Sequence, residues 1–373
     1  MADTAALLDD LRAEGESLEA LVSGLDPGQW LRPTPAVGWT IAHQIAHLAW
    51  TDARAGEAIT APEVFAREVA ESRRAPDRFV DDGAAAGAAE QPAALLSRWR
   101  AGRTHLIDLL AELPAGAKLP WYGPAMGAAS MATARLMETW AHGQDVADAL
   151  GVRRPATARL RHIAHIGTRA RDYAYLVHDL DPPQEEFRVE LTAPDGSLWC
   201  YGPPTATQRV SGPALDFCLL VTQRAHRDDL ALRVDGAEAR RWLGIAQAFA
   251  GPPGRGRRAG GTPGATGPTG QDDDGGPAPV PAPGARIAGC AVGRAAPVAR
   301  TAKRSRAARA ADLVRTSDAA RTAESARTAD SARTADPVRT AHSARTTDPA
   351  RAAGGVAVPA CPSGAVRPSG ARG

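Results

Sequence analysis

The distribution of aromatic residues divides this chain of 373 residues into two parts. Residues 255–373 contain no Phe, Trp or Tyr, and apart from valines their only large aliphatic residues are Ile287 and Leu313. A segment of this composition cannot bury enough apolar surface to offset the conformational entropy that it would lose on folding. We therefore expect residues 255–373 to form a disordered tail, and the folded part of the chain to end near residue 254.

The predicted tail contains a six-residue repeat with units such as Arg-Thr-Ala-Asp-Ser-Ala. Its arginines are Arg315, Arg321, Arg327, Arg333, Arg339, Arg345 and Arg351. This period matches neither an α-helix nor a coiled coil, and no large apolar residue marks the turns of a β-helix, so we do not expect a stacked solenoid. Expansion of a short coding repeat, or translation in a shifted frame, would give such a segment without a function. Weak association with anions or nucleic acid is the alternative.

Charge divides at the same position. From Arg255 onward there are 19 Lys and Arg and 9 Asp and Glu, a net charge of +10, so the total of +2 leaves −8 for residues 1–254. An acidic folded part argues against a nucleic-acid-binding domain.

The sequence also lacks the segments that direct a protein to or across a membrane. It has no run of about 18 apolar residues, and its first ten residues lack the basic segment and apolar core of a signal peptide. Its four cysteines show no CxxC pairing. We expect a cytoplasmic protein that makes no contact with a membrane.

Apolar residues spaced three and four positions apart predict helices over the first half of the chain. The four long helices are predicted over residues 4–25, from Ile41 onward, over 92–113 and over 128–150. A short helix is expected over 63–73 and a further one over 157–178, whereas Asp81-Asp82-Gly83 and the alanines and glycines that follow resemble a loop. Four long amphipathic helices imply a bundle, which we place in residues 1–180.

The periodicity changes from helical to alternating after Pro183. Phe187, Val189 and Leu191 alternate with polar residues, as in a strand with one buried face, and Asp195-Gly196 is a hairpin signal. Helices over 215–223 and 238–249 and a strand over 230–234 are also predicted. Residues 181–254 therefore read as a small α+β domain.

A metal site is one interpretation of three residues in the predicted bundle. Glu138 and His142 lie four positions apart on a helix, so their side chains project from one face, and the second long helix adds His47. Two imidazoles and a carboxylate from facing helices suit Zn²⁺ or a similar divalent ion and leave a position open for water or substrate. The spacing alone also describes a solvated surface pair, so a helical scaffold without metal is the alternative.

Three residues near the candidate ligands have two interpretations each. His43 forms a His-x-x-x-His pair with His47, but we expect it to be a histidine on the helix surface. Asp52 and Asp145 have the chemistry to orient a ligand imidazole through its second nitrogen, although we expect both to be exposed helical aspartates.

Three segments resemble the DinB-like metal-binding bundle of the mycothiol-dependent maleylpyruvate isomerase family. They are Gly38-Trp39-Thr40, Ile45-Ala46-His47-Leu48-Ala49-Trp50-Thr51-Asp52 and Glu138-Thr139-Trp140-Ala141-His142-Gly143-Gln144-Asp145-Val146. The first metal-binding histidine of the family corresponds to His47, and its glutamate and second histidine correspond to Glu138 and His142. The resemblance spans about residues 5–258.

The C-terminal part of the resemblance concerns the thiol cofactor. The segment that ends in Gln223-Arg224 is similar to the family's C-terminal, sterol-carrier-like domain, whose helix ends in Gly-Arg. The resemblance implies a role for Arg224 in catalysis and cofactor binding, and His226, two residues later, is a second candidate for cofactor binding.

The activity that the resemblance implies is that of a zinc-dependent transferase or isomerase. It would use mycothiol as cofactor and act on a small electrophile, with the divalent metal activating the thiol as a thiolate. A non-catalytic metal-binding or sensing protein of the same fold is the alternative. Bundles of this type often pair, so a homodimer is an expected assembly.

Overall fold

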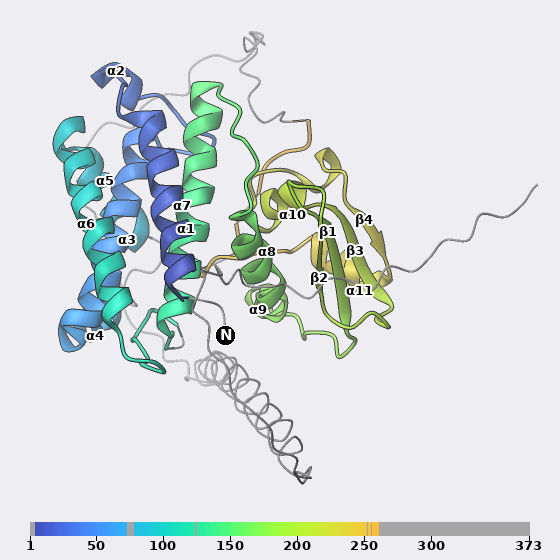
Figure 1. Ribbon diagram of the computed structural model, residues 1–373. Coiled ribbons are helices and arrows are strands. Elements are labelled where there is room, and N and C mark those ends of the chain that lie inside the picture. The colour runs from blue at the N-terminus through green and yellow to red at the C-terminus, as the bar shows by residue number, and fades with distance from the viewer. Residues whose placement is uncertain (1–3, 73–77, 124, 252, 255, 261–373) are drawn as a thin grey trace, which may run out of the picture. The chain divides into compact units, whose positions relative to one another are not determined.

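The computed structural model describes residues 4–72, 78–123, 125–251, 253–254 and 256–260 (Figure 1). The predicted tail from residue 261 onward, with its hexapeptide repeats, lies outside the described residues.

Four long helices form the bundle, as predicted: α1 (Thr4–Val22), α3 (Ile41–Thr60), α6 (Pro92–Glu112) and α7 (Ala128–Leu150) (Figure 1). Their ends follow local sequence. Thr40 is the N-cap of α3, Pro92 is the first residue of α6, and Gly151 ends α7 with a φ of +69°, a left-handed conformation that glycine adopts without steric cost. Helix α3 packs against α6 and α7, while α1 packs against α7 and α6.

The apolar stripes of these helices face one another. Among the largest fully buried side chains are Leu18 of α1, Ile45 and Leu48 of α3, and Leu95 and Trp99 of α6. Burial of a side chain of this size contributes about 1.5–3 kcal/mol, so tertiary packing supplies most of the stability of each helix.

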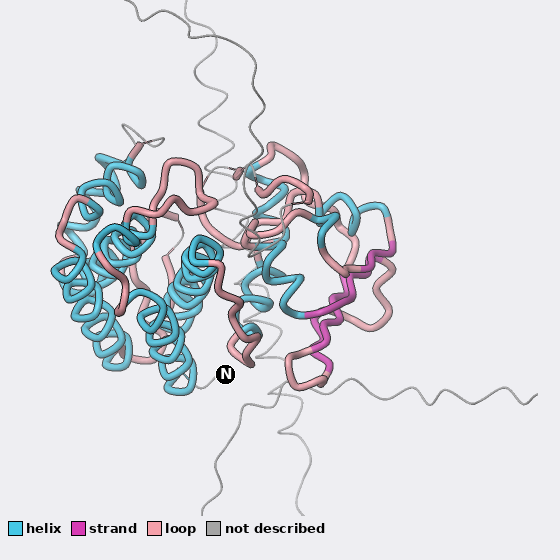
Figure 2. Tube along the Cα trace, turned by 90° about the horizontal axis from the view of Figure 1, so that it is seen from above, coloured by secondary structure: helices cyan, strands magenta, loops and turns pink. Residues whose placement is uncertain are grey.

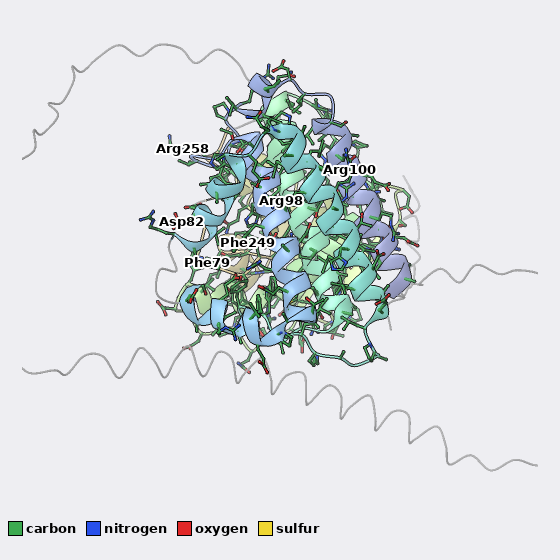
Figure 3. All side chains as sticks on the ribbon, turned by 90° about the vertical axis from the view of Figure 1, so that its left-hand side faces the viewer. Phe79, Asp82, Arg98, Arg100, Phe249 and Arg258 are labelled. Carbon is green, nitrogen blue, oxygen red and sulfur yellow. The ribbon has the colours of Figure 1, made fainter. Side chains whose placement is uncertain are left out.

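Three shorter helices accompany the bundle: α2 (Pro27–Trp30), α4 (Pro62–Ser72) and α5 (Phe79–Ala88). The prediction of a loop after Asp81 was wrong, because α5 occupies this region. Asp81 and the exposed Asp82 stand in its first turn, where negative charge is favourable, and the alanines that follow are strong helix formers (Figure 3). Its glycines serve close packing: a Cβ atom on Gly87 would lie 2.9 Å from the Cβ of Ala46.

The helix predicted over 157–178 is divided into α8 (Leu160–Arg169) and α9 (Arg171–Val177), which meet at Ala170. Helix α8 packs against α7 and α10 (Ala214–Val221). The connection before α8 is fixed by Glu14, which is 1% exposed and accepts hydrogen bonds from Arg154 and Arg159.

A small mixed sheet follows: β1 (Phe187–Thr192), β2 (Leu198–Tyr201), β3 (Gln208–Pro213) and β4 (Arg233–Asp235), in the order β2-β1-β3-β4 (Figure 1). Figure 2 shows its strands in magenta, beside helices of the same part. β1 pairs antiparallel with β2 and parallel with β3, and β3 pairs antiparallel with β4. The short helices α10, η1 (Arg227–Asp229) and α11 (Ala237–Leu243) complete this part. The predicted fold class, a helical bundle followed by a small α+β domain, is confirmed.

Three details of the α+β part differ from the prediction. Strand β4 spans Arg233–Asp235, not the predicted residues 230–234. Strand β3 was not predicted, because Val210 is its only buried residue and Gly212-Pro213 reads as a turn. Helix α11 ends at Leu243, before the predicted end at residue 249. None of the described helices combines the length and apolar character of a membrane span.

Candidate metal centre

The structure brings His47, Glu138 and His142 together across two packed helices. His47 projects from α3, and Glu138 and His142 project one turn apart from α7. One candidate ligand atom from each residue lies within 4.8 Å of the others. Both histidines are buried and Glu138 is partly buried.

Two of the three distances within this cluster are close to those between the ligands of a tetrahedral metal ion. Glu138 Oε2 lies 3.2 Å from His142 Nε2 and 3.5 Å from His47 Nε2. Ligand atoms at the usual distances from Zn²⁺ are about 3.3 Å apart in a tetrahedral site. Three protein ligands would leave the fourth position for an external ligand, and the same donors also suit other divalent transition metals.

The protonation states at this cluster are those that a metal requires. Burial, together with the nearby charge of His47, lowers the pKa of His142 to about 4. Burial acts to raise the pKa of Glu138, but its electrostatic interactions with His142 and His47 hold that pKa well below the usual range. At neutral pH His142 is therefore uncharged and Glu138 is ionised, so metal binding there does not first have to remove a proton from either.

Two residues that the sequence analysis did not single out complete the surroundings. Gln44 is fully buried on α3, and its Oε1 lies 2.5 Å from His142 Nδ1. The indole of Trp39 lies against both ligand rings, with centroids 5.3 Å from His47 and 5.9 Å from His142, and it is stacked on His142 at 17°. Its Nε1 donates to Asp81 Oδ1 over 3.0 Å. Trp39 belongs to the Gly38-Trp39-Thr40 segment of the family resemblance, but no sequence periodicity indicated where its ring would lie.

Comparison with known proteins agrees with this architecture. Residues 11–147 match the family described as mycothiol maleylpyruvate isomerase N-terminal domain, and residues 183–233 match a family described as wyosine base formation. Two uncharacterized proteins, from Mycobacterium tuberculosis strains CDC 1551 / Oshkosh and ATCC 25618 / H37Rv, are each 58% identical over 257 residues. The alignments cover 69% of this chain and 100% of each relative.

This chain belongs to the same family as these two mycobacterial proteins, and its residues 11–147 belong to the mycothiol maleylpyruvate isomerase N-terminal domain family. Two crystal structures of mycothiol-dependent maleylpyruvate isomerase, one of them a point mutant, have TM-scores of 0.43 and 0.42 and 17% and 16% identity. Those alignments cover 60% of this chain and 90% of each structure.

His43 lies outside the cluster that His47, Glu138 and His142 form. The backbone nitrogen of Thr40 donates to His43 Nδ1 over 3.3 Å, and Thr40 Oγ1 lies 2.8 Å from the same atom. The side chain thus turns back to the start of α3 and supports its N-cap. It is partly buried, which differs from the surface histidine that we expected.

The expectation that Asp52 and Asp145 are exposed was wrong, because they are 5% and 2% exposed. Asp52 Oδ1 accepts from Arg135 Nε over 2.9 Å, and Asp145 accepts from Arg224 Nη2 over 2.8 Å and from Arg257 Nη2 over 2.6 Å. Both carboxylates bind arginine and neither is seen to orient a ligand histidine. The arginine partners come from distant parts of the sequence, which is why single-helix reasoning missed them.

Arg224 follows α10 and lies beside the cluster. Its ion pair with Asp145 places it one turn of α7 beyond His142, close enough for its charge to contribute to the lowered pKa of that histidine. Its Nη1 donates to the carbonyl oxygen of Thr222 over 2.6 Å, and its buried Nε has no partner among the described residues.

His226 occupies a different setting. Its Nδ1 accepts from the backbone nitrogen of Asp228 over 3.2 Å, so it caps η1. It also lines a cavity of about 190 Å³ with Gln223 and Arg257. Arg257, which the sequence analysis assigned to the tail, thus contacts both α7 and this cavity. The functional roles of Arg224 and His226 stay predictions, as do the expected domain boundaries.

Proposed function

We propose that this protein is a zinc-dependent transferase or isomerase that uses mycothiol, with His47, Glu138 and His142 as metal ligands. The observation that carries the proposal is the position of Glu138 Oε2, 3.2 Å and 3.5 Å from two imidazole nitrogens on facing helices. When bound there, a divalent cation would stabilise the thiolate form of a thiol cofactor near neutral pH.

The three candidate ligands and Trp39 each have a role in the proposed site. His142 and His47 offer nitrogen lone pairs to the metal, and ionised Glu138 reduces the net charge of the occupied site. The indole of Trp39 covers the two imidazoles and keeps bulk water from that side, which strengthens electrostatic interactions within the site.

Arg224 is the proposed contact for the cofactor. It brings a fixed positive charge next to the cluster and has a buried N–H without a partner among the described residues. Such a donor suits an anionic or carbonyl oxygen of a ligand. His226 would contact the cofactor only through the neighbouring cavity. We propose cytoplasmic function, as the sequence analysis expected.

Metal analysis tests the binding part of the proposal. Purified wild-type protein and a His105→Ala control, altered at an exposed histidine on α6, should each contain about one equivalent of metal, and His142→Ala should contain much less. Metal near zero in all three proteins would refute the metal site and leave a helical scaffold.

Turnover is tested separately. Conjugation of mycothiol to a panel of electrophiles should depend on metal and stop when a chelator is added. Metal that is present without turnover on any electrophile would favour a non-catalytic metal-binding or sensing protein. The engagement of Arg224 by Asp145 is the observation that favours this second function.

A further inference from the structure

A chain of hydrogen bonds connects His142 to the loop that carries Trp39. Gln44 Oε1 lies 2.5 Å from His142 Nδ1, and Gln44 Nε2 lies 2.8 Å from Thr34 Oγ1. Thr34 Oγ1 in turn lies 2.9 Å from the carbonyl oxygen of Trp39, which also accepts from the backbone nitrogen of Thr34 over 2.8 Å.

The direction of each hydrogen bond follows from the last acceptor of the chain, the backbone carbonyl oxygen of Trp39. A carbonyl oxygen has no proton, so the hydroxyl of Thr34 donates its single proton to Trp39. The hydroxyl must then accept from Gln44, which identifies the Gln44 atom facing it as the NH₂ group. The opposite orientation of the amide would place two oxygens without a proton 2.8 Å apart. The other end of the amide is therefore an oxygen, and His142 Nδ1 must carry a proton to donate to it.

We propose that Gln44 is a positioning residue that holds His142 in its Nδ1–H tautomer, so that Nε2, the nitrogen facing Glu138, has a free lone pair for a metal. The proposal rests on the proposed metal site. Thr34 fixes the Gln44 amide, and the loop that holds Trp39 against the ring of His142 therefore also sets the tautomer of that ring.

The position of Glu138 explains why the tautomer of His142 matters for metal binding. Without an acceptor at Nδ1, neutral His142 gains a hydrogen bond by moving its proton to Nε2, where the carboxylate of Glu138 is 3.2 Å away. That proton would occupy the lone pair that the metal needs. No comparable hydrogen bond fixes the tautomer of His47, because its buried Nδ1 has no partner among the described residues. The loss of the lone pair on His142 Nε2 is therefore not made good at His47.

Substitution of Gln44 tests the proposal with two readouts on the full-length chain. The tautomer is read from long-range ¹H–¹⁵N correlation spectra of metal-free protein with labelled histidine, with the His142 signals assigned by their loss in His142→Ala. The dissociation constant for Zn²⁺ is measured by competition with a chromophoric chelator.

Gln44→Met keeps the length of the side chain but removes the acceptor, so His142 should shift toward the Nε2–H tautomer and the dissociation constant for Zn²⁺ should rise 10–100-fold. Gln44→Glu restores an acceptor and should retain the Nδ1–H tautomer, with an affinity within about 3-fold of wild type. Gln144→Met is the matched control: Gln144 is a buried glutamine on α7 that donates to Asp148, and its loss should change neither readout. If Gln44→Met does not fold, Thr34→Val frees the amide to rotate and should give a mixture of tautomers.

An unchanged tautomer in both Gln44→Met and Thr34→Val would overturn the proposal. So would equal losses of affinity in Gln44→Met and Gln44→Glu, because packing rather than the acceptor would then explain them. If wild-type protein binds no Zn²⁺, the proposed function fails, while the spectra of metal-free protein still decide whether Gln44 sets the tautomer.

Discussion

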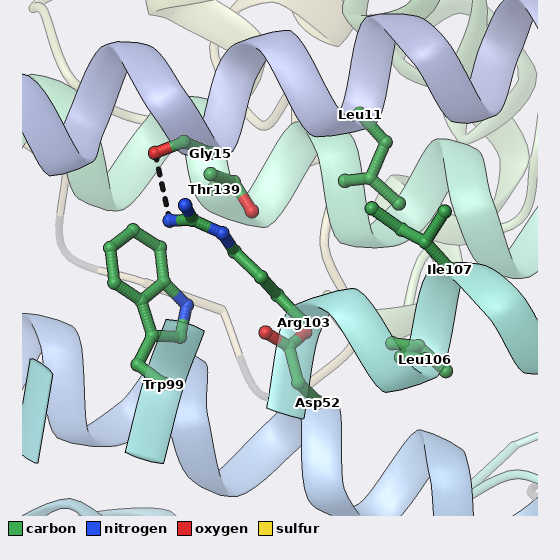
Figure 4. A pocket seen from close by; sticks show the side chains of 8 residues that line it. All are labelled: Leu11, Gly15, Asp52, Trp99, Arg103, Leu106, Ile107 and Thr139. Atoms are coloured by element: carbon green, nitrogen blue, oxygen red, sulfur yellow. Dashed lines mark hydrogen bonds between the residues drawn. The ribbon is translucent and has the colours of Figure 1, made fainter. Parts of the chain in front are cut away.

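The ion pair of Asp52 and Arg135 lies buried between the two helices that carry the candidate ligands, and its disruption has a calculable cost. The side chains are 6% and 3% exposed, and Oδ1 and Nε are 2.9 Å apart. Asp52 also lines a small cavity of about 10 Å³, enough for about one water, beside Trp99 and Thr139 (Figure 4). The perturbation that we consider is Arg135→Met, which keeps the bulk of the side chain and removes its charge.

The variant leaves a carboxylate in the bundle core without its partner. Removal of one member of a buried pair costs about 3–5 kcal/mol, whereas replacing both members by apolar residues is often neutral. The double variant Asp52→Leu/Arg135→Met should therefore lose less stability than Arg135→Met alone. The coupling energy of the double-mutant cycle should reach about 2–3 kcal/mol.

The pH dependence of this loss has a definite sign. Burial raises the pKa of Asp52, and Arg135 opposes that rise, so the pKa is higher still in Arg135→Met. A carboxyl group whose pKa is higher in the folded than in the unfolded state contributes more stability as pH falls. The difference in unfolding free energy between Arg135→Met and wild type should thus be largest near pH 7 and smaller at pH 5.

Urea unfolding of the full-length proteins, followed by circular dichroism at both pH values, measures these differences. A loss below about 1 kcal/mol at pH 7, or additive effects in the double variant, would show that the pair is not a coupled buried unit. A loss of unfolding free energy that is larger at pH 5 than at pH 7 would contradict the raised pKa of Asp52.

Three further predictions concern stability. Because burial lowers the pKa of His142 to about 4, only the unfolded chain takes up its proton between about pH 6.5 and 4, so the melting temperature should fall as the pH falls over this range; a flat profile would contradict this. Glu14→Ala leaves two partly buried arginines without their shared carboxylate and should cost about 3–5 kcal/mol in urea unfolding; a loss below about 1 kcal/mol would mean that solvent replaces the carboxylate. Gly167→Ala places a Cβ atom 2.7 Å from Val221 Cγ2 and should cost about 1–3 kcal/mol, which Val221→Ala should recover; no recovery would place the strain elsewhere.

The long helices could be predicted from short-range periodicity, and the meeting of the three candidate ligands could be predicted from that periodicity together with the family resemblance. Glu138 and His142 share a face of α7 through their spacing alone, and the bundle leaves few ways to place His47. Helix α5 was missed because its glycines, which resemble loop residues in sequence, serve packing against α3.

The surroundings of the site could not be predicted, because their partners are distant in sequence. Gln44 and His142 are 98 positions apart, and Asp145 meets Arg224 and Arg257 over 79 and 112 positions. No local pattern distinguishes a helical aspartate that binds two such arginines from one that faces solvent. Buried charges of this kind are visible only after the tertiary contacts are known.

The separation of the ligands along the chain also bears on how the protein folds. A site divided between α3 and α7 exists only after these helices have docked, so a metal cannot organise an early, local intermediate. Bound metal would act on the completed bundle, and its stabilisation would appear mainly as slower unfolding. The unfolding rate in the presence of a chelator would then measure how strongly α3 and α7 pack against each other without bound metal.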